Sequence, residues 1–197
     1  SIGVEDVDLE AATDLGVLVT NCPTEANWGG VAEGTIALML AFLKRVCERD
    51  RHIKSGGWRD KSLLGTYLGG REDGYAGVTV GIIGLGRIGS RVADLMAPWR
   101  VRLLACDPFI DEEHFAEHGV EQVDLETLLK EADVVTLHCD LTAETRNLIS
   151  RERLRLMKST ALLINTARGQ IVDVDALCDA LRDGELAGAV LDVLPEE

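Results

Sequence analysis

The sequence predicts an α/β domain whose core is a doubly wound parallel sheet with helices on both faces. From about residue 79 onward, short apolar runs alternate with stretches of helical periodicity. Strands that alternate with helices are joined by right-handed crossovers, which produces a parallel sheet. The 197 residues include 20 glycines and only 4% aromatic residues, which favours many tight turns over a β-sandwich. Their hydrophobic fraction of 46% is enough for one substantial core.

The predicted strands are short and apolar, as expected of strands that are buried on both faces. They cover residues 79–83, 102–106, 134–138, 161–165 and 189–193. Helices are predicted at 87–97, at about 111–118, from Asp124 to about Glu131, from Ser150 to about Met157, and at 174–182. Asp124 and Ser150 are predicted to cap the starts of their helices, and Gly184 is predicted to cap the end of the last helix.

Two upstream segments differ from this alternation. A long helix is predicted at roughly 31–50, and its apolar residues lie almost all round, so more than one neighbour must bury it. We interpret it as a domain hinge or as a subunit interface through which a homodimer is expected, with an ordinary core helix as the alternative. The stretch from Ser55 to Gly77 holds seven glycines and is predicted to be a loop.

The charge and the cysteines narrow the class of protein. A formal net charge of −14 repels phosphate backbones and acidic lipid surfaces, so we predict no direct nucleic-acid partner and no membrane partner. We also find no apolar run long enough to span a bilayer. Five cysteines without any C-x-x-C spacing are typical of a reducing cytosol, which predicts a cytoplasmic location. Because the chain starts at Ser1 and stops directly after a strand-like segment, we expect a piece of a longer polypeptide.

The segment Gly84-Leu85-Gly86-Arg87-Ile88-Gly89 has the pattern G-x-G-x-x-G, directly after a predicted strand and at the start of a predicted helix. In that context the pattern is typical of a Rossmann dinucleotide-binding domain. The first glycine permits a tight turn, the second lets the backbone approach a pyrophosphate, and the third lets the helix pack closely on the strand. The unpaired N–H groups at the start of the helix then bind the phosphates.

Asp107 predicts which dinucleotide binds. It ends the second predicted strand, about 20 residues past the glycines, where a carboxylate accepts hydrogen bonds from the adenosine ribose. The same charge repels the 2′-phosphate of NADP: two like charges ~4 Å apart cost about 4 kcal/mol at an effective dielectric constant near 20, roughly three decades in affinity. We therefore predict NAD as the cofactor. The alternative, that an aspartate before Pro108 only forms a turn, fits the glycine spacing less well.

Further candidate residues follow the later strands, because ligands of doubly wound sheets bind beyond the carboxyl ends of the strands. Cys139 and Asp140 follow the third predicted strand, residues 166–169 the fourth, and residues 192–197 the fifth. Arg168 is the most informative of them, since a guanidinium presents a fork of donors to a carboxylate. The alternative is a solvated arginine on a loop.

Together these motifs resemble the D-isomer-specific 2-hydroxyacid dehydrogenases, and within them the branch that contains D-3-phosphoglycerate dehydrogenase. The resemblance rests on residues 81–89, 138–139, 164–169 and 188–197, and upstream on residues 3–13, Asn27 and residues 31–33. It implies reversible hydride transfer between NAD and a small D-2-hydroxy acid or 2-oxo acid. It also implies that residues 1–20 are a remnant of a substrate domain and that residues 21–197 form the NAD-binding Rossmann domain.

The resemblance also implies roles for individual residues. Those implied for the cofactor are Gly84, Gly86, Arg87, Ile88, Gly89, Asp107, Cys139, Thr166, Ala167, Arg168 and Asp192, with the N–H groups of Arg87 and Ile88 on the pyrophosphate. Arg168 is implied to be catalytic and to bind the substrate carboxylate and carbonyl oxygen, and Asn27 to approach the substrate. Glu197 is implied to be the acidic partner of a catalytic histidine. That histidine is expected beyond the end of this chain, because none of the four histidines present matches its position.

Two other interpretations belong to different classes. Corepressors of the C-terminal-binding-protein type resemble the same family and use NAD mainly to assemble a protein-binding scaffold.

Separately, residues 114–118 match H-x-x-E-H, a pattern in which two histidines on one helical face hold zinc. Because this pattern lies on a connecting helix without an evident third ligand, we interpret these residues as surface residues and predict no metal site.

Overall fold

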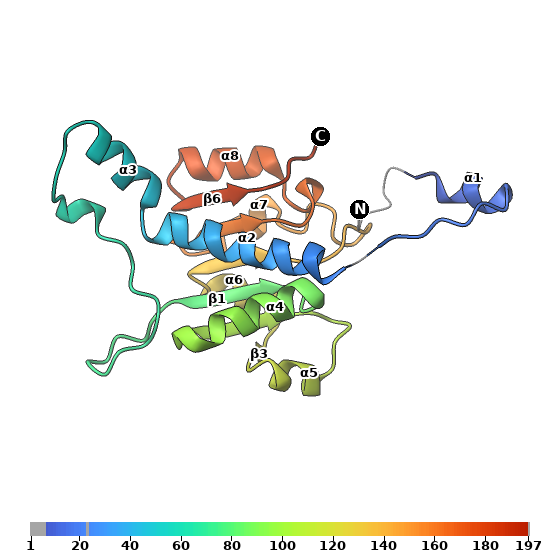
Figure 1. Cartoon of the computed structure of the whole chain (residues 1–197), viewed down its shortest axis with the longest axis horizontal. Coiled ribbons are helices and arrows are strands. Elements are labelled where there is room, and N and C mark those ends of the chain that lie inside the picture. The colour runs from blue at the N-terminus through green and yellow to red at the C-terminus, as the bar shows by residue number, and fades with distance from the viewer. Residues whose placement is uncertain (1–6, 23, 197) are drawn as a thin grey trace.

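The computed structural model describes residues 7–22 and 24–196, and these residues form one six-stranded parallel sheet with helices on both faces (Figure 1). The strands are β1 (Thr79–Ile83), β2 (Arg102–Cys106), β3 (Glu121–Gln122), β4 (Val134–Leu137), β5 (Leu162–Asn165) and β6 (Gly188–Leu191). Their order in space is β3-β2-β1-β4-β5-β6, so the direction of winding reverses between β1 and β4. This is the strand order of a dinucleotide-binding Rossmann sheet, and the predicted fold class is confirmed.

The helices separate the strands as the sequence predicts. They are α1 (Leu9–Asp14), α2 (Glu25–Leu43), α3 (Val46–Lys54), α4 (Arg87–Met96), α5 (Glu112–Glu117), α6 (Leu125–Glu131), α7 (Arg151–Leu154) and α8 (Val174–Arg182), with short 3₁₀ turns η1 (Lys61–Leu63), η2 (Ala97–Trp99) and η3 (Gly169–Ile171). α1 has no buried residue and lies apart from the sheet (Figure 1). The domain boundary predicted near residue 20 stays a prediction.

The predicted helix caps have mixed outcomes. Asp124 accepts the N–H of Thr127 at 2.9 Å and caps α6 as predicted. Gly184 has φ 71° just past the end of α8, as expected of a glycine that ends a helix. Ser150 lies at the N-cap position of α7 as predicted, but its side chain makes no capping bond to the backbone, and its hydroxyl donates to the Glu152 carboxylate at 2.8 Å. The helix α7 covers only Arg151–Leu154, so it ends before the predicted Met157.

The single helix predicted at 31–50 is wrong, because the structure has two. α2 starts earlier, at Glu25, and ends at Leu43; α3 then starts at Val46. Arg45 between them has φ 53°, a left-handed conformation that breaks the helical hydrogen-bond pattern. The break coincides with the change from the apolar α2 to the charged residues Lys44 and Arg45 and the polar α3, a change that the predicted single helix did not take into account.

One face of α2 packs against the domain, and the rest is less covered. Ala32, Thr35 and Met39 are its buried residues, and they lie on one stripe that faces α4 and the sheet. By length and composition α2 is apolar enough to cross a membrane, whereas the sequence analysis found no such run. Only 17% of its most apolar 18-residue segment is buried within the domain. The Thr35 hydroxyl lies 3.0 Å from the Thr166 hydroxyl at the end of β5, which ties α2 to the sheet.

Each face of the sheet carries its own apolar core. On one face α6, α7 and α8 contribute buried side chains such as Leu128, Leu154 and Leu177. On the other face α2, α4 and α5 contribute Met39, Val92 and Phe115 among others. Burial on both faces explains why the central strands are apolar throughout. The two packed layers hold the strand ends rigidly in place.

Candidate functional site

Five strands end level with one another at one edge of the sheet. Ile83 pairs with both Cys106 and Leu137, Leu137 pairs with Asn165, and Asn165 pairs with Leu191. The residues that follow these strand ends therefore form one row, and they are Asp107, Gly84, His138, Thr166 and Asp192. Most of the residues predicted for the site are in this row or within a few positions of it. The structure thus brings them to one edge, as expected for a sheet of this topology.

The three glycines of the loop after β1 have different structural reasons to be glycine. Gly84 has φ 92°, and a Cβ there would lie 2.6 Å from the Cys139 nitrogen. At Gly89 a Cβ would lie only 2.1 Å from the Gly84 carbonyl oxygen, so the start of α4 packs directly on the turn. A Cβ at Gly86 would meet nothing within 4 Å. The first and third glycines are required by the fold itself, whereas the second keeps a space open.

The start of α4 offers backbone donors beside that open space. Gly86 is the residue before the helix, and a glycine has no side chain that could bond the first N–H groups of the helix. The first N–H groups of an α-helix have no partner within the helix, and here they belong to Arg87, Ile88 and Gly89. Such a cluster of N–H groups, at the positive end of the helix dipole, binds anions such as a pyrophosphate.

Asp107 is held rigidly at the end of β2. One carboxylate oxygen accepts the N–H of Leu85 at 2.8 Å, and the other accepts the N–H of Phe109 at 3.0 Å. Each oxygen keeps a further lone pair, so the fixed carboxylate can also accept bonds from a ribose. The same residue lines a groove of about 400 Å³ together with Cys106, Pro108, Gln122, Val123 and Asp124. Two carboxylates on this groove make it unfavourable for an added phosphate.

Arg168 lies in a turn that Asn165 organises. The Asn165 side chain accepts the N–H of Ala167 at 3.0 Å and donates to the Arg168 carbonyl at 2.9 Å. The guanidinium is partly buried and donates to the Ala167 carbonyl at 2.8 Å. Next to it, a Cβ on Gly169 would lie 2.1 Å from the Leu194 carbonyl carbon, so the turn packs directly on the segment after β6. The role of Asn165 was not predicted, although a buried asparagine at a strand end is a signal for such a turn.

Two other predicted residues are held by packing. The Thr166 side chain is buried and pairs with Thr35, as described above. Cys139 is partly buried, and burial raises the pKa of its thiol to about 11. The thiol therefore stays protonated at neutral pH and does not act as a nucleophile.

The structure does not test the roles predicted for Asn27, Asp192 and Glu197. Asn27 is exposed in the first turn of α2, where its side-chain oxygen accepts a hydrogen bond from the Thr24 hydroxyl. Asp192 follows β6, and its N–H donates to the Asn165 carbonyl at 2.9 Å. Glu197 lies outside the described residues. The roles predicted for these three residues stay predictions.

His138 is a partly buried histidine to which the sequence analysis assigned no chemical role. Its Nε2 lies 2.9 Å from the Thr136 hydroxyl, and its Nδ1 is buried without a hydrogen-bond partner in the part of the chain that the structure describes. Burial lowers the pKa of the imidazole to about 3. The residue is therefore neutral at the edge of the sheet where the site lies.

We expect His138 to make the domain acid-sensitive. Its ordinary pKa is 6.5 and its folded pKa is about 3, so between these values the unfolded chain binds the extra proton. Stability therefore falls as the pH drops below about 6.5, by up to about 1.4 kcal/mol per pH unit from this residue. His138→Gln should flatten this dependence in urea unfolding measured from pH 7 to pH 5. His52→Gln, at a histidine bonded to the Trp58 carbonyl, should keep the wild-type slope; equal slopes in both variants would contradict the assignment.

Comparison with known proteins identifies this arrangement. Residues 36–197 match the model of the D-isomer specific 2-hydroxyacid dehydrogenase, NAD binding domain. The chain belongs to this family. It is 44% identical to a glyoxylate reductase of Aeropyrum pernix over 100% of this chain and 58% of that protein. It is 40% identical to a D-3-phosphoglycerate dehydrogenase of Archaeoglobus fulgidus over 100% of this chain and 36% of that protein.

Solved structures agree with this assignment. The D-lactate dehydrogenase of Aquifex aeolicus, determined with NAD and lactic acid, is similar with a TM-score of 0.88 at 38% identity, over 100% of this chain and 56% of that one. The predicted family and the predicted cofactor are confirmed at the level of the domain. The chain spans between 36% and 58% of the length of the two curated relatives described above.

The described residues fit the dinucleotide. The open space over Gly86 and the N–H groups at the start of α4 suit a pyrophosphate. The fixed carboxylate of Asp107, beside its groove, suits an adenosine ribose. When bound, NAD supplies the nicotinamide carbon that accepts or donates a hydride.

Proposed function

We propose that the whole protein is an NAD-dependent dehydrogenase that interconverts small D-2-hydroxy acids and 2-oxo acids. The observation that carries this proposal is the level row of strand ends, with the glycine loop and Asp107 near one end of the row and the Arg168 turn near the other. A dinucleotide laid along such an edge has one end at the acidic groove and the other near Arg168. The relatives described above act on glyoxylate, 3-phosphoglycerate or lactate according to their names.

Arg168 is proposed to hold the substrate. A guanidinium binds a carboxylate through two parallel N–H donors and can also stabilise charge that develops on a neighbouring oxygen. The bonds from Asn165 and the close packing at Gly169 limit the motion of the turn, so little ordering is needed when a substrate binds. The proposed proton donor is a histidine outside this sequence, with Glu197 as its acidic partner.

Assembly and location are part of the proposal. We propose a homodimer through the region that includes α2, supported by the partly exposed apolar residues on the side of α2 that the domain does not bury. A cytoplasmic location is supported by five cysteines that are all free. No nucleic-acid partner is proposed, because the charge of −14 opposes one.

The direct experiment measures turnover by the full-length protein. The 2-oxo acids tested are glyoxylate and the oxidised forms of lactate and 3-phosphoglycerate, each with NADH. We expect NADH consumption with at least one of them, and, for the two chiral 2-hydroxy acids, oxidation of the D-enantiomer but not the L-enantiomer in the reverse direction. A protein that turns over none of them, yet dimerises in an NAD-dependent manner and captures short peptides, would favour the corepressor class instead.

A further inference from the structure

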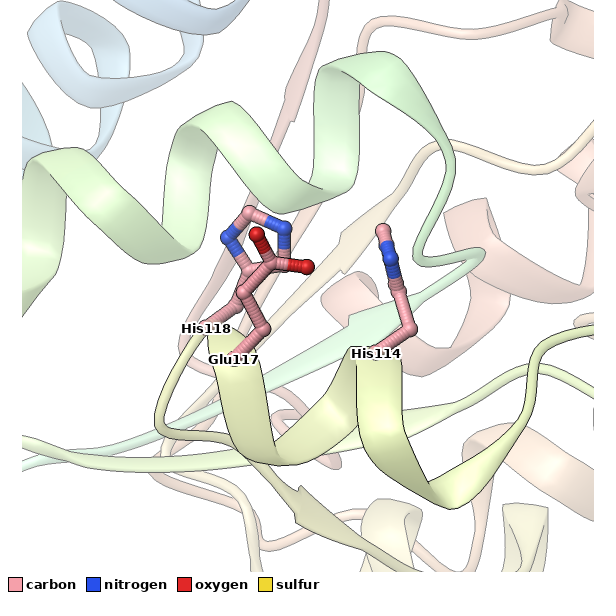
Figure 2. A group of neighbouring side chains, drawn as sticks. All are labelled: His114, Glu117 and His118. Atoms are coloured by element: carbon pink, nitrogen blue, oxygen red, sulfur yellow. The ribbon is translucent and has the colours of Figure 1, made fainter.

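Two imidazoles and a carboxylate gather at one point between α5 and α4 (Figure 2). His114, Glu117 and His118 are three and four residues apart, so they lie on one face of the helical turn and point toward α4. One donor atom from each lies within 4.8 Å of the donor atoms of the other two. The sequence analysis found no third ligand beside the two histidines, but the glutamate of the same pattern, Glu117, is close enough to both of them to be that ligand.

The hydrogen bonds of His114 determine which of its nitrogens has a free lone pair. Its Nε2 lies 3.1 Å from the Leu85 carbonyl and 2.9 Å from the Ser90 hydroxyl. A carbonyl oxygen only accepts, so Nε2 carries the proton in the contact with Leu85. In the neutral ring Nδ1 is then the unprotonated nitrogen.

His118 is oriented in a similar way. Its Nδ1 lies 2.7 Å from a carboxylate oxygen of Asp94, a residue of α4. A carboxylate also only accepts, so Nδ1 carries the proton and the neutral ring has its lone pair on Nε2. Histidines that bind metals usually donate their other ring N–H to a carboxylate or to a backbone carbonyl. Both arrangements occur here, one on each imidazole.

We propose that His114, Glu117 and His118 bind one divalent transition-metal ion, for which Zn²⁺ is the best chemical match. Two imidazoles and one carboxylate are ligands that Zn²⁺ accepts with tetrahedral geometry, and a water completes the four. Ligand atoms at ~2.0–2.1 Å from a tetrahedral ion lie about 3.3 Å apart, and the donor atoms here lie within 4.8 Å of one another. Side-chain rotations that move each donor atom by on the order of 1 Å would therefore close the site. The net charge of −14 also favours a bound cation.

The proposed ion has a structural role. It would bind two residues of α5 and His118, which directly follows α5, while Asp94 and Ser90 of α4 hold the two imidazoles. The ion therefore fixes α5 against the helix that starts at the glycine loop. None of the three proposed ligands is among the residues assigned to the cofactor, although His114 contacts the glycine loop at the Leu85 carbonyl. A ligand that binds only the folded state raises the melting temperature, so Zn²⁺ should stabilise the domain.

The experiment is a titration of the EDTA-treated 197-residue chain with Zn²⁺ by calorimetry, together with a Co²⁺ absorption spectrum. We expect one ion per chain, a higher melting temperature with Zn²⁺, and a Co²⁺ spectrum without the charge-transfer band of thiolate ligands. Glu117→Gln removes the charge of an exposed residue and should weaken binding at least tenfold without affecting folding. Asp94→Asn should weaken binding by roughly 10-fold or more by releasing His118, because the loss of such an outer partner typically has that effect.

His52→Gln is the matched control, because it removes a histidine on α3 and should leave Zn²⁺ affinity unchanged. The double variant His114→Gln/His118→Gln should lose stoichiometric binding, and circular dichroism checks that it folds. A wild-type chain that binds no stoichiometric Zn²⁺ overturns the proposal. So does unchanged affinity in Glu117→Gln, or a thiolate band in the Co²⁺ spectrum, which would assign the ion to the cysteines.

Discussion

Replacing Arg168 by alanine in the full-length protein should lower kcat/KM for 2-oxo acid reduction by about 10³-fold, equivalent to about 4 kcal/mol of transition-state stabilisation. The variant loses the bidentate donor to the substrate carboxylate and the positive charge beside the developing alkoxide. Affinity for NAD should fall by much less, because the glycine loop and Asp107 are unchanged. Steady-state kinetics together with calorimetry of NAD binding measure the two effects separately.

Two variants make this test specific. Arg168→Lys keeps the charge but loses the planar fork of donors, so its activity should lie between those of the wild type and the alanine variant. Arg155→Ala removes an exposed arginine at the end of α7 and should leave the kinetics unchanged. Wild-type kcat/KM in Arg168→Ala would exclude this residue from the mechanism.

The central strands could be predicted from the sequence because burial on both faces makes them continuous apolar runs. The bounds predicted for β1 and β2 are those observed, and α8 covers the predicted residues 174–182. The edge strand β3 was missed because it consists of the exposed residues Glu121 and Gln122, which have no apolar pattern. Its pairing with β2 depends on tertiary structure rather than on local propensity.

Other failures have a similar physical origin. The break at Arg45 depends on one left-handed residue, and apolar periodicity carries no information about a single backbone dihedral. Ser150 has the residue type of a helix cap and lies at the N-cap position of α7, but its oxygen accepts no backbone N–H there. Local chemistry of this kind is settled by rotamers that the sequence does not specify.

The candidate site was predicted best where a residue acts through its backbone or through its place after a strand. The glycine loop and Asp107 depend on local order along the chain, and the structure has both at the predicted edge of the sheet. The partners that hold the site come from distant segments, as in the contact of Thr35 with Thr166. His114, Glu117 and His118 share one helical turn, but the groups that orient the two imidazoles, Ser90 and Asp94, come from α4. Such contacts require the tertiary fold.

The glycines of the loop should separate cofactor binding from folding. Gly86→Ala adds a methyl group into open space at a φ of −75°, which alanine adopts without strain, so the domain should keep or slightly gain stability. The same methyl group occupies the space that we assign to the pyrophosphate, so NAD affinity should fall at least tenfold. Calorimetry with NAD and thermal unfolding without it measure the two effects.

Gly89→Ala is the matched substitution three residues later, with the opposite pattern expected. Its methyl group would lie 2.1 Å from the Gly84 carbonyl oxygen, a backbone atom that cannot move without displacing the turn after β1. Overpacking of this kind costs about 1–3 kcal/mol or more, so the melting temperature without NAD should fall clearly. If Gly86→Ala instead binds NAD like the wild type, the pyrophosphate does not pass over this loop. The anion site at the start of α4 would then lose its main support, whatever Gly89→Ala does to stability.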